Sequence, residues 1–156
     1  MRDSMLVTVP DEYLVEIGKA SVQWSLLESV LDLCMIKLAG YTEVEPRAAA
    51  IFAHMTFPVK LDVFAAMVDS ILEDYPQLDE YQDVLKPVRE AQKARNRIAH
   101  GKWNYENGVV TIAHLTARGK VKTSIEPITI DELKTAAYLI GKASIRVWKL
   151  VVPHRE

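Results

Sequence analysis

The sequence contains little cysteine and few glycines and prolines. Its 156 residues include one cysteine, Cys34, which excludes an internal disulfide and a cysteine-based zinc cage. Six glycines and seven prolines are too few for a collagen-like or low-complexity chain. With 49% apolar and 26% charged residues the composition is that of a globular protein, and the length predicts a single domain over residues 1–156.

The sequence has no long hydrophobic run, and we do not expect its first ten residues to act as a secretory signal. The longest uncharged apolar stretch, 48–59, is interrupted by His54 and Pro58 and falls short of the roughly 20 residues that a membrane span requires. Residues 1–10 include Asp3 and lack the apolar core of a secretory signal. We therefore expect a soluble, cytoplasmic protein without membrane contact, and the single cysteine agrees with a reducing compartment.

Basic residues are concentrated in one segment although the net charge is only −2. Residues 86–102 contain six Lys or Arg and one Glu, a net +5, so the rest of the chain carries −7, which is −2 minus +5. Such a strip can bind an anion locally, or it is simply a solvated helix face. A smaller basic group follows at Arg118, Lys120 and Lys122.

Helical periodicity dominates the chain. Apolar residues at steps of three and four, together with start and stop signals, predict helices over about 8–40, 46–55, 58–76, 78–99 and 129–151. Pro87 lies inside the fourth helix and should kink or split it, and Gly101 follows as a natural C′ residue. Thr129 and Glu132 match a capping box at the start of the fifth.

Before the last helix the period changes to two. Residues 109–115 and 121–128 have the pattern of strands, with turns at Asn107–Gly108 and at 117–120. The predicted fold is therefore mainly all-α: an up-and-down bundle of four to five helices with a β-hairpin inserted before the last helix.

Familiar catalytic motifs are missing. The sequence has no Gly-rich phosphate loop, nucleophile elbow, zinc helix or calcium loop, and its four histidines are scattered. We therefore expect neither a metal site nor a cofactor. What remains is the end of the fourth predicted helix, where Asn96 and His100 share a face while Arg95 lies about 140° from His100. Arg95 and His100 converge only if the helix end turns at Gly101 or if a partner chain supplies the second copy.

The pattern Arg-polar-x-x-x-His at a helix end, here Arg95 to His100, resembles the HEPN superfamily. An early helix with an acid in its apolar stripe, here Trp24 to Glu28, is also similar to many members. The resemblance implies an HEPN-like bundle and a metal-independent endoribonuclease that works as a homodimer, with paired motifs at the interface. It also implies toxin or phage-defence roles, with a cognate antitoxin or nucleotidyltransferase as partner. Lys102 stands where some HEPN toxins carry a tyrosine that an antitoxin modifies.

The residue types suit RNA cleavage, because RNA carries its own nucleophile, the 2′-hydroxyl. His100 would transfer a proton, Arg95 would hold phosphoryl oxygens, and Asn96 would orient the imidazole or the phosphate. The helix C-terminus stabilises an imidazolium while the neighbouring cations disfavour it, so the acid and base roles of His100 both stay open. Glu28 is expected to support the site by pairing with Arg95 or Arg97.

Further RNA contacts are expected from Lys93, Lys102 and Trp103. Trp103 and Tyr105 stack on bases, or they seal the helix end against the hairpin. His100 and Arg95 equally suit a structural arrangement in which one caps the helix and the other pairs with an inner acid. Three hypotheses follow: an HEPN-type ribonuclease, a catalytically inactive HEPN-like module that binds RNA or protein, and a plain helical dimer.

Overall fold

A computed structural model describes residues 9–152 of the chain. In chain order its elements are the helices α1 (Asp11–Leu38), α2 (Pro46–Ala53) and α3 (Phe57–Ile71), the 3-10 helix η2 (Pro76–Leu78), helix α4 (Tyr81–His100), the strands β1 (Lys102–Glu106), β2 (Val109–Arg118) and β3 (Lys120–Pro127), and helix α5 (Ile130–Val151). The mainly helical prediction is confirmed. The predicted single hairpin is corrected to a three-stranded antiparallel sheet of order β1-β2-β3.

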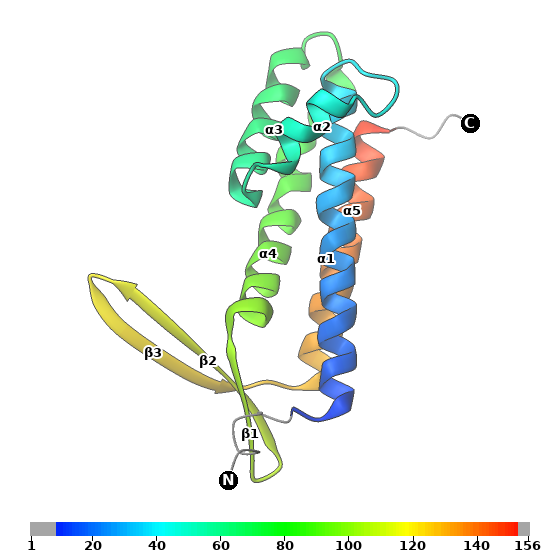
Figure 1. The fold of residues 1–156 in the computed structure, drawn as a ribbon. Helices are drawn as coiled ribbons and strands as arrows, with labels where there is room; N and C mark the ends of the chain where they lie inside the picture. The colour runs from blue at the N-terminus through cyan, green and yellow to red at the C-terminus, as the bar shows by residue number, and fades with distance from the viewer. Residues whose placement is uncertain (1–8, 153–156) are drawn as a thin grey trace.

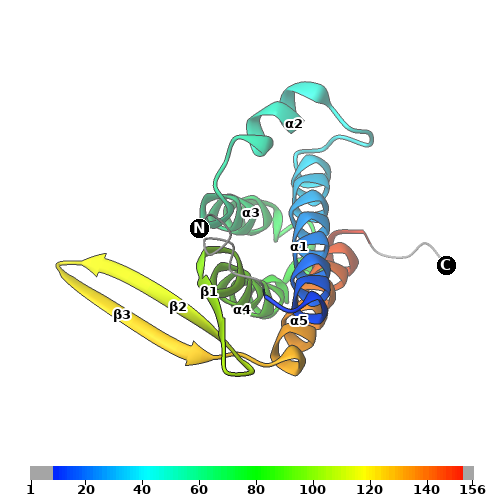
Figure 2. The same ribbon diagram turned by 60° about the horizontal axis from the view of Figure 1, so that its bottom comes forward.

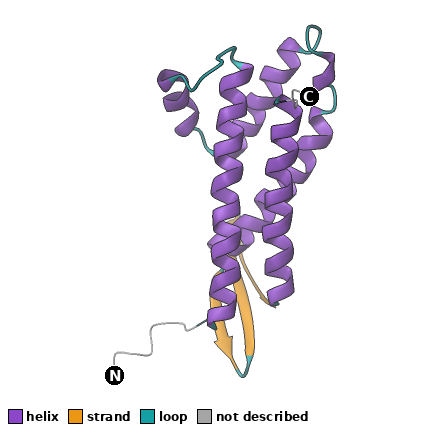
Figure 3. Ribbon diagram, turned by 90° about the vertical axis from the view of Figure 1, so that its right-hand side faces the viewer, coloured by secondary structure: helices purple, strands orange, loops and turns teal. Residues whose placement is uncertain are grey.

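Three long helices form the body of the molecule, and the sheet lies at one end of it (Figures 1 and 3). α1 and α5 lie side by side and run in the same direction, while α4 runs in the opposite direction (Figure 1). The sheet returns the chain to the end of the bundle where α4 finishes, so α5 starts there and runs antiparallel to α4. Along the chain, the three long helices α1, α4 and α5 therefore alternate in direction. None of the helices in the described part combines the length and the apolar character needed to cross a membrane.

The predicted apolar stripes form a common core. The buried side chains of α1 and α5 include Ala20, Trp24, Leu27, Leu31, Cys34, Leu133, Ile140, Ala143 and Val147. Removing such side chains from water stabilises the fold by roughly 1.5–3 kcal/mol for each large aliphatic group. This packing fixes the relative positions of the helices that carry the candidate site.

Helix α4 is continuous across Pro87, so the expected split does not occur. Proline lacks the N–H that would bond to the carbonyl one turn earlier, which weakens the helix locally. Apolar residues on both sides of it, among them Leu85, Val88 and Ala91, are completely buried. Burial of this face therefore holds the helix together through the proline.

A two-residue turn at Asn107–Gly108 joins β1 to β2. Both residues have positive φ, 51° and 80°, as a tight hairpin turn with asparagine and glycine requires. Trp103 pairs with Ile112 in the resulting ladder, and β1 is the strand that the sequence prediction missed. The β2–β3 hairpin projects away from the helices (Figure 2). Of the smaller basic group, Lys122 is exposed, whereas the side chains of Arg118 and Lys120 lie outside the described part.

Candidate functional site

Arg95, Asn96 and His100 come together at the C-terminal end of α4. Nη1 of Arg95 lies 3.2 Å from Nε2 of His100, and it donates to Oδ1 of Asn96 at 3.2 Å. The three side chains thus meet within one chain. α4 stays helical as far as His100, so the long side chain of Arg95, and not a turn of the helix end, spans the angular separation.

The Arg95–His100 contact constrains which nitrogen of the imidazole can accept a hydrogen bond. A guanidinium group has only donors, so Nε2 of His100 must accept. The contact is a hydrogen bond for the tautomer that carries its hydrogen on Nδ1, because Nε2 then has a free lone pair. The same lone pair can take up a proton, so this geometry is compatible with the base role of His100.

Gly101 allows β1 to leave the end of α4 directly. Its backbone is extended, with φ −72° and ψ 147°, so it is not the left-handed C′ residue that the sequence suggested. A Cβ atom here would overlap the side chain of Ile112 and would lie 2.8 Å from the carbonyl oxygen of Arg97. Close approach of the sheet is therefore the physical reason for a glycine at this position.

The guanidinium of Arg95 lies over the ring of Trp24. Cζ of Arg95 lies 5.2 Å from the centroid of the Trp24 ring, which is within range of a cation–π interaction. Trp24 is buried and also contacts Phe57, with ring centroids 4.3 Å apart. The sequence places Trp24 four residues before Glu28 on one helix face, but this spacing alone does not identify Trp24 as the partner of Arg95.

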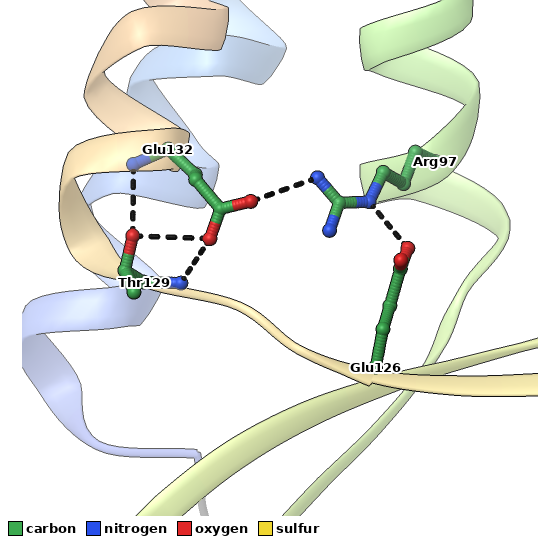
Figure 4. A network of polar contacts seen from close by, with 4 residues as sticks. All are labelled: Arg97, Glu126, Thr129 and Glu132. Carbon is green, nitrogen blue, oxygen red and sulfur yellow. Dashed lines mark hydrogen bonds and ion pairs between the residues drawn. The ribbon is translucent and has the colours of Figure 1, made fainter.

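Arg97 does not pair with Glu28, which corrects one of the two expected pairings. Its Nε donates to Glu126 of β3 at 2.8 Å, and its Nη1 donates to Glu132 of α5 at 3.3 Å (Figure 4). Glu132 also closes the capping box with Thr129. Arg97 therefore connects α4 to the sheet and to the start of α5, and it belongs to the scaffold of the site.

Glu28 makes no ion pair with any side chain that the structure describes, so the expected pairing with Arg95 is also wrong. Both residues line a pocket of about 200 Å³ between α1 and α4. The half-buried carboxylate of Glu28 thus belongs to the wall of this pocket and does not orient Arg95 through an ion pair.

The remaining predicted contacts are dispersed around the helix end. Lys93 is exposed and pairs with Glu90 at 2.7 Å, and Lys102 is exposed at the start of β1. Trp103 is half-buried, and its Nε1 donates to the carbonyl of Ile98 at 3.2 Å. This bond supports the sealing role of Trp103 over base stacking, because it satisfies one of the carbonyls left open at a helix C-terminus.

Metal-ligating side chains are not clustered in the part of the chain that is described. Within residues 9–152, no group of three or more His, Cys, Asp or Glu side chains is arranged to hold a metal ion. The candidate site itself presents a guanidinium, an amide and an imidazole. Comparison with known proteins adds no family: no family model, no curated protein and no solved structure matches this chain.

Proposed function

We propose that this protein is a metal-independent endoribonuclease of the HEPN type, acting as a homodimer. The observation that carries the proposal is the contact between Arg95 and His100, 3.2 Å apart at the end of α4. It joins a permanent cation, which can stabilise charge on phosphoryl oxygens, to an imidazole, which can transfer protons during attack by the 2′-hydroxyl. His100 is exposed, so a polymer can reach it.

The reaction begins at the 2′-hydroxyl of the nucleotide that precedes the cleaved bond. Nε2 of His100 exchanges its contact with Arg95 for one with this hydroxyl and removes its proton. The 2′-oxygen then bonds to phosphorus, and the bond between phosphorus and the 5′-oxygen breaks. The products are a 2′,3′-cyclic phosphate and a 5′-hydroxyl end, and Arg95 stabilises the charge that develops on the phosphoryl oxygens.

A second proton donor is needed for the departing 5′-oxygen. One imidazole cannot remove the first proton and donate the second in the same concerted step. The chain supplies one imidazole in this cluster, so the second comes from His100 of another copy, which must be protonated and therefore cannot accept from its own Arg95. This requirement is the chemical reason for proposing a homodimer with a composite site.

The test is cleavage of single-stranded RNA by the purified chain in the presence of a metal chelator. We expect cleavage with a cyclic phosphate end, and its loss in His100→Ala, since positioned acid–base groups contribute roughly 10²–10⁴-fold. His54→Ala is the matched control, because His54 is exposed at the end of α2 and lies outside the cluster. RNA that stays intact with high concentrations of the wild-type protein contradicts the proposal.

The same contact also favours a second candidate, a catalytically inactive module that binds RNA. Arg95 occupies the lone pair of Nε2 that a base needs, and a contact that never opens would leave only the cation to bind phosphate. This candidate predicts salt-sensitive RNA binding that is lost in Arg95→Ala, without cleavage. If Arg95→Ala lowers only the melting temperature, the motif is structural and both candidates fail.

A further inference from the structure

The pocket between α1 and α4 adjoins the Arg95–His100 contact. It is lined on the α1 side by Ser21, Trp24, Ser25 and Glu28, and on the α4 side by Arg95 and Ile98. Its volume of about 200 Å³ is below the roughly 300–1,000 Å³ of sites for drug-sized ligands, so it suits one small ring system. Because Arg95 belongs to both the pocket and the candidate site, a ligand here would lie next to the reacting phosphate.

The α1 wall of the pocket offers hydrogen-bond acceptors. The Ser21 hydroxyl donates to the carbonyl of Ile17 at 2.9 Å, and the Ser25 hydroxyl donates to the carbonyl of Ser21 at 3.2 Å. Each hydroxyl has a single hydrogen, so only lone pairs remain for a ligand. The carboxylate of Glu28 has no partner among the side chains that are described. The serines and Glu28 therefore favour a ligand that presents donors to them, while the Nε1–H of Trp24 on the same wall is buried without an acceptor.

The α4 wall offers a donor. The contacts of the Arg95 guanidinium with Asn96 and His100 involve only Nη1. Its other N–H groups have no acceptor within the described part of the chain and are available to a ligand. The pocket thus has acceptors on one wall and a cationic donor on the other.

We propose that this pocket is a nucleobase subsite that selects guanine; the inference rests on the proposed ribonuclease function. Guanine has two adjacent donors, N1–H and the N2 amino group, which match the two oxygens of one carboxylate. Its O6 acceptor adjoins N1 and accepts a hydrogen bond from the guanidinium. Arginine also donates to O6 of guanine in the major groove of DNA. In this arrangement the Glu28 carboxylate accepts from N1–H and from the N2 amino group, and the Arg95 guanidinium donates to O6.

The other three bases match the pocket less well. Uracil has one imino donor between two carbonyl acceptors, which would face the acceptors of Glu28 and the serines. Adenine and cytosine each present one amino group beside an unprotonated ring nitrogen, so only one oxygen of the carboxylate would be satisfied. A polar group left unpaired in a pocket lowers affinity, and this penalty generates the selectivity.

The first experiment measures binding of the four nucleoside 5′-monophosphates by NMR titration of the full chain. All four carry the same phosphate, so differences between them report the base. We expect GMP to bind about tenfold more tightly than UMP, in line with hydrogen bonds to a charged group. Glu28→Gln should abolish this preference, because the amide replaces one acceptor by a donor while keeping the size of the side chain.

A matched control variant makes the binding result specific. Glu12→Gln changes an exposed acid in the first turn of the same helix and should keep the preference for GMP. A circular dichroism spectrum of Glu28→Gln that equals that of the wild type shows that the fold is retained. Should the spectrum change, Ser25→Ala, which removes one acceptor from the same wall, replaces it with the same expected direction.

The second experiment separates this inference from the ribonuclease proposal. The substrate is a single-stranded RNA with one guanosine among adenosines and uridines. Cleavage beside guanosine that becomes unselective in Glu28→Gln supports both. Cleavage without base preference, together with equal binding of the four monophosphates, overturns the subsite and leaves the ribonuclease proposal standing. Selective GMP binding without any cleavage supports the subsite and overturns the ribonuclease proposal, whereas equal binding without cleavage overturns both.

Discussion

Nη1 of Arg95 lies 3.2 Å from Nε2 of His100, although the two residues are five positions apart on one helix. The aliphatic part of the Arg95 side chain is long enough to follow the helix surface. The centroid of the Trp24 ring lies 5.2 Å from the guanidinium carbon Cζ. The guanidinium is thus held by an aromatic face on one side and by polar contacts on the other. This arrangement requires the shape of arginine as well as its charge.

Arg95→Lys should therefore impair the proposed activity while preserving RNA binding. Lysine keeps the positive charge but lacks the planar fork that contacts Asn96, His100 and two phosphoryl oxygens together. We expect cleavage to fall by roughly 10²–10³-fold, the effect of losing one donor to a transition-state oxyanion. Gel assays of cleavage and of binding at one salt concentration measure both effects. A lysine variant that cleaves as fast as the wild type would contradict the assigned role of Arg95.

Arg97→Gln should lower stability without changing the proposed chemistry. It removes the ion pairs that connect α4 to Glu126 of β3 and to Glu132 of α5. These groups are partly exposed, so each pair contributes only about 0.2–1 kcal/mol and the melting temperature should fall by a few degrees. A double-mutant cycle with Glu126→Gln measures the coupling. Additive effects of the two substitutions would show that the contact contributes nothing.

The stabilising effect of Glu132 should disappear in acid. The hydrogen bond from the backbone N–H of Thr129 is the main cause that lowers the pKa of Glu132 below its ordinary 4.5. Since the folded-state pKa is the lower one, the contribution is present above about pH 4.5 and is lost as the pH falls through the folded-state pKa. The difference in melting temperature between wild type and Glu132→Gln should shrink on acidification. A difference that does not change with pH would contradict this assignment.

Two glycine substitutions should have opposite effects on stability. In Gly101→Ala the new methyl group would overlap the Ile112 side chain and crowd the carbonyl of Arg97, which costs about 1–3 kcal/mol. In Gly18→Ala the methyl group meets nothing within 4 Å on an exposed helix face, which should stabilise the protein by about 0.5–1 kcal/mol. Urea unfolding of both variants tests this pair. Equal effects would mean that the sheet does not approach Gly101 closely.

Cys34 should resist alkylation as long as the protein is folded. Burial raises the pKa of its thiol from 9.0 to about 12, and Lys37 offsets this only slightly. The thiolate is the reactive form, so almost none is present at mildly alkaline pH. Mass spectrometry after iodoacetamide treatment should show labelling only once urea unfolds the chain. Rapid labelling of the native protein would contradict the burial of Cys34.

Much of the secondary structure could be predicted because its signals are local. The apolar period of α1, the capping box of Thr129 and Glu132, and the Asn107–Gly108 turn all act within a few residues. β1 was missed because five residues between a helix end and a turn are too few for a periodic pattern. The sequence left open whether Pro87 kinks or splits α4, because the burial of apolar residues on both sides of the proline, which keeps the helix continuous, depends on tertiary packing.

The candidate site was only partly predictable. Proximity of Asn96 and His100 follows from helical spacing, but the contact with Arg95 depends on a side-chain conformation. The partners of Arg97 and the place of Glu28 depend on how α4 packs against β3, α5 and α1. Charge alone suggested that Glu28 pairs with Arg97, but in the folded chain Arg97 forms ion pairs with Glu126 and Glu132.

The amino-acid sequence by itself determined where the helices begin and end, which of their faces are apolar, and that Arg95, Asn96 and His100 share one helix end. Only the tertiary structure decided that Trp24 supports Arg95, that Arg97 binds Glu126 and Glu132, and that Glu28 lines a pocket. The physical reason is the separation along the chain over which each interaction acts. Helix propensity, capping and turn geometry act between neighbours along the chain, whereas these contacts join segments that only the packing of the core brings together.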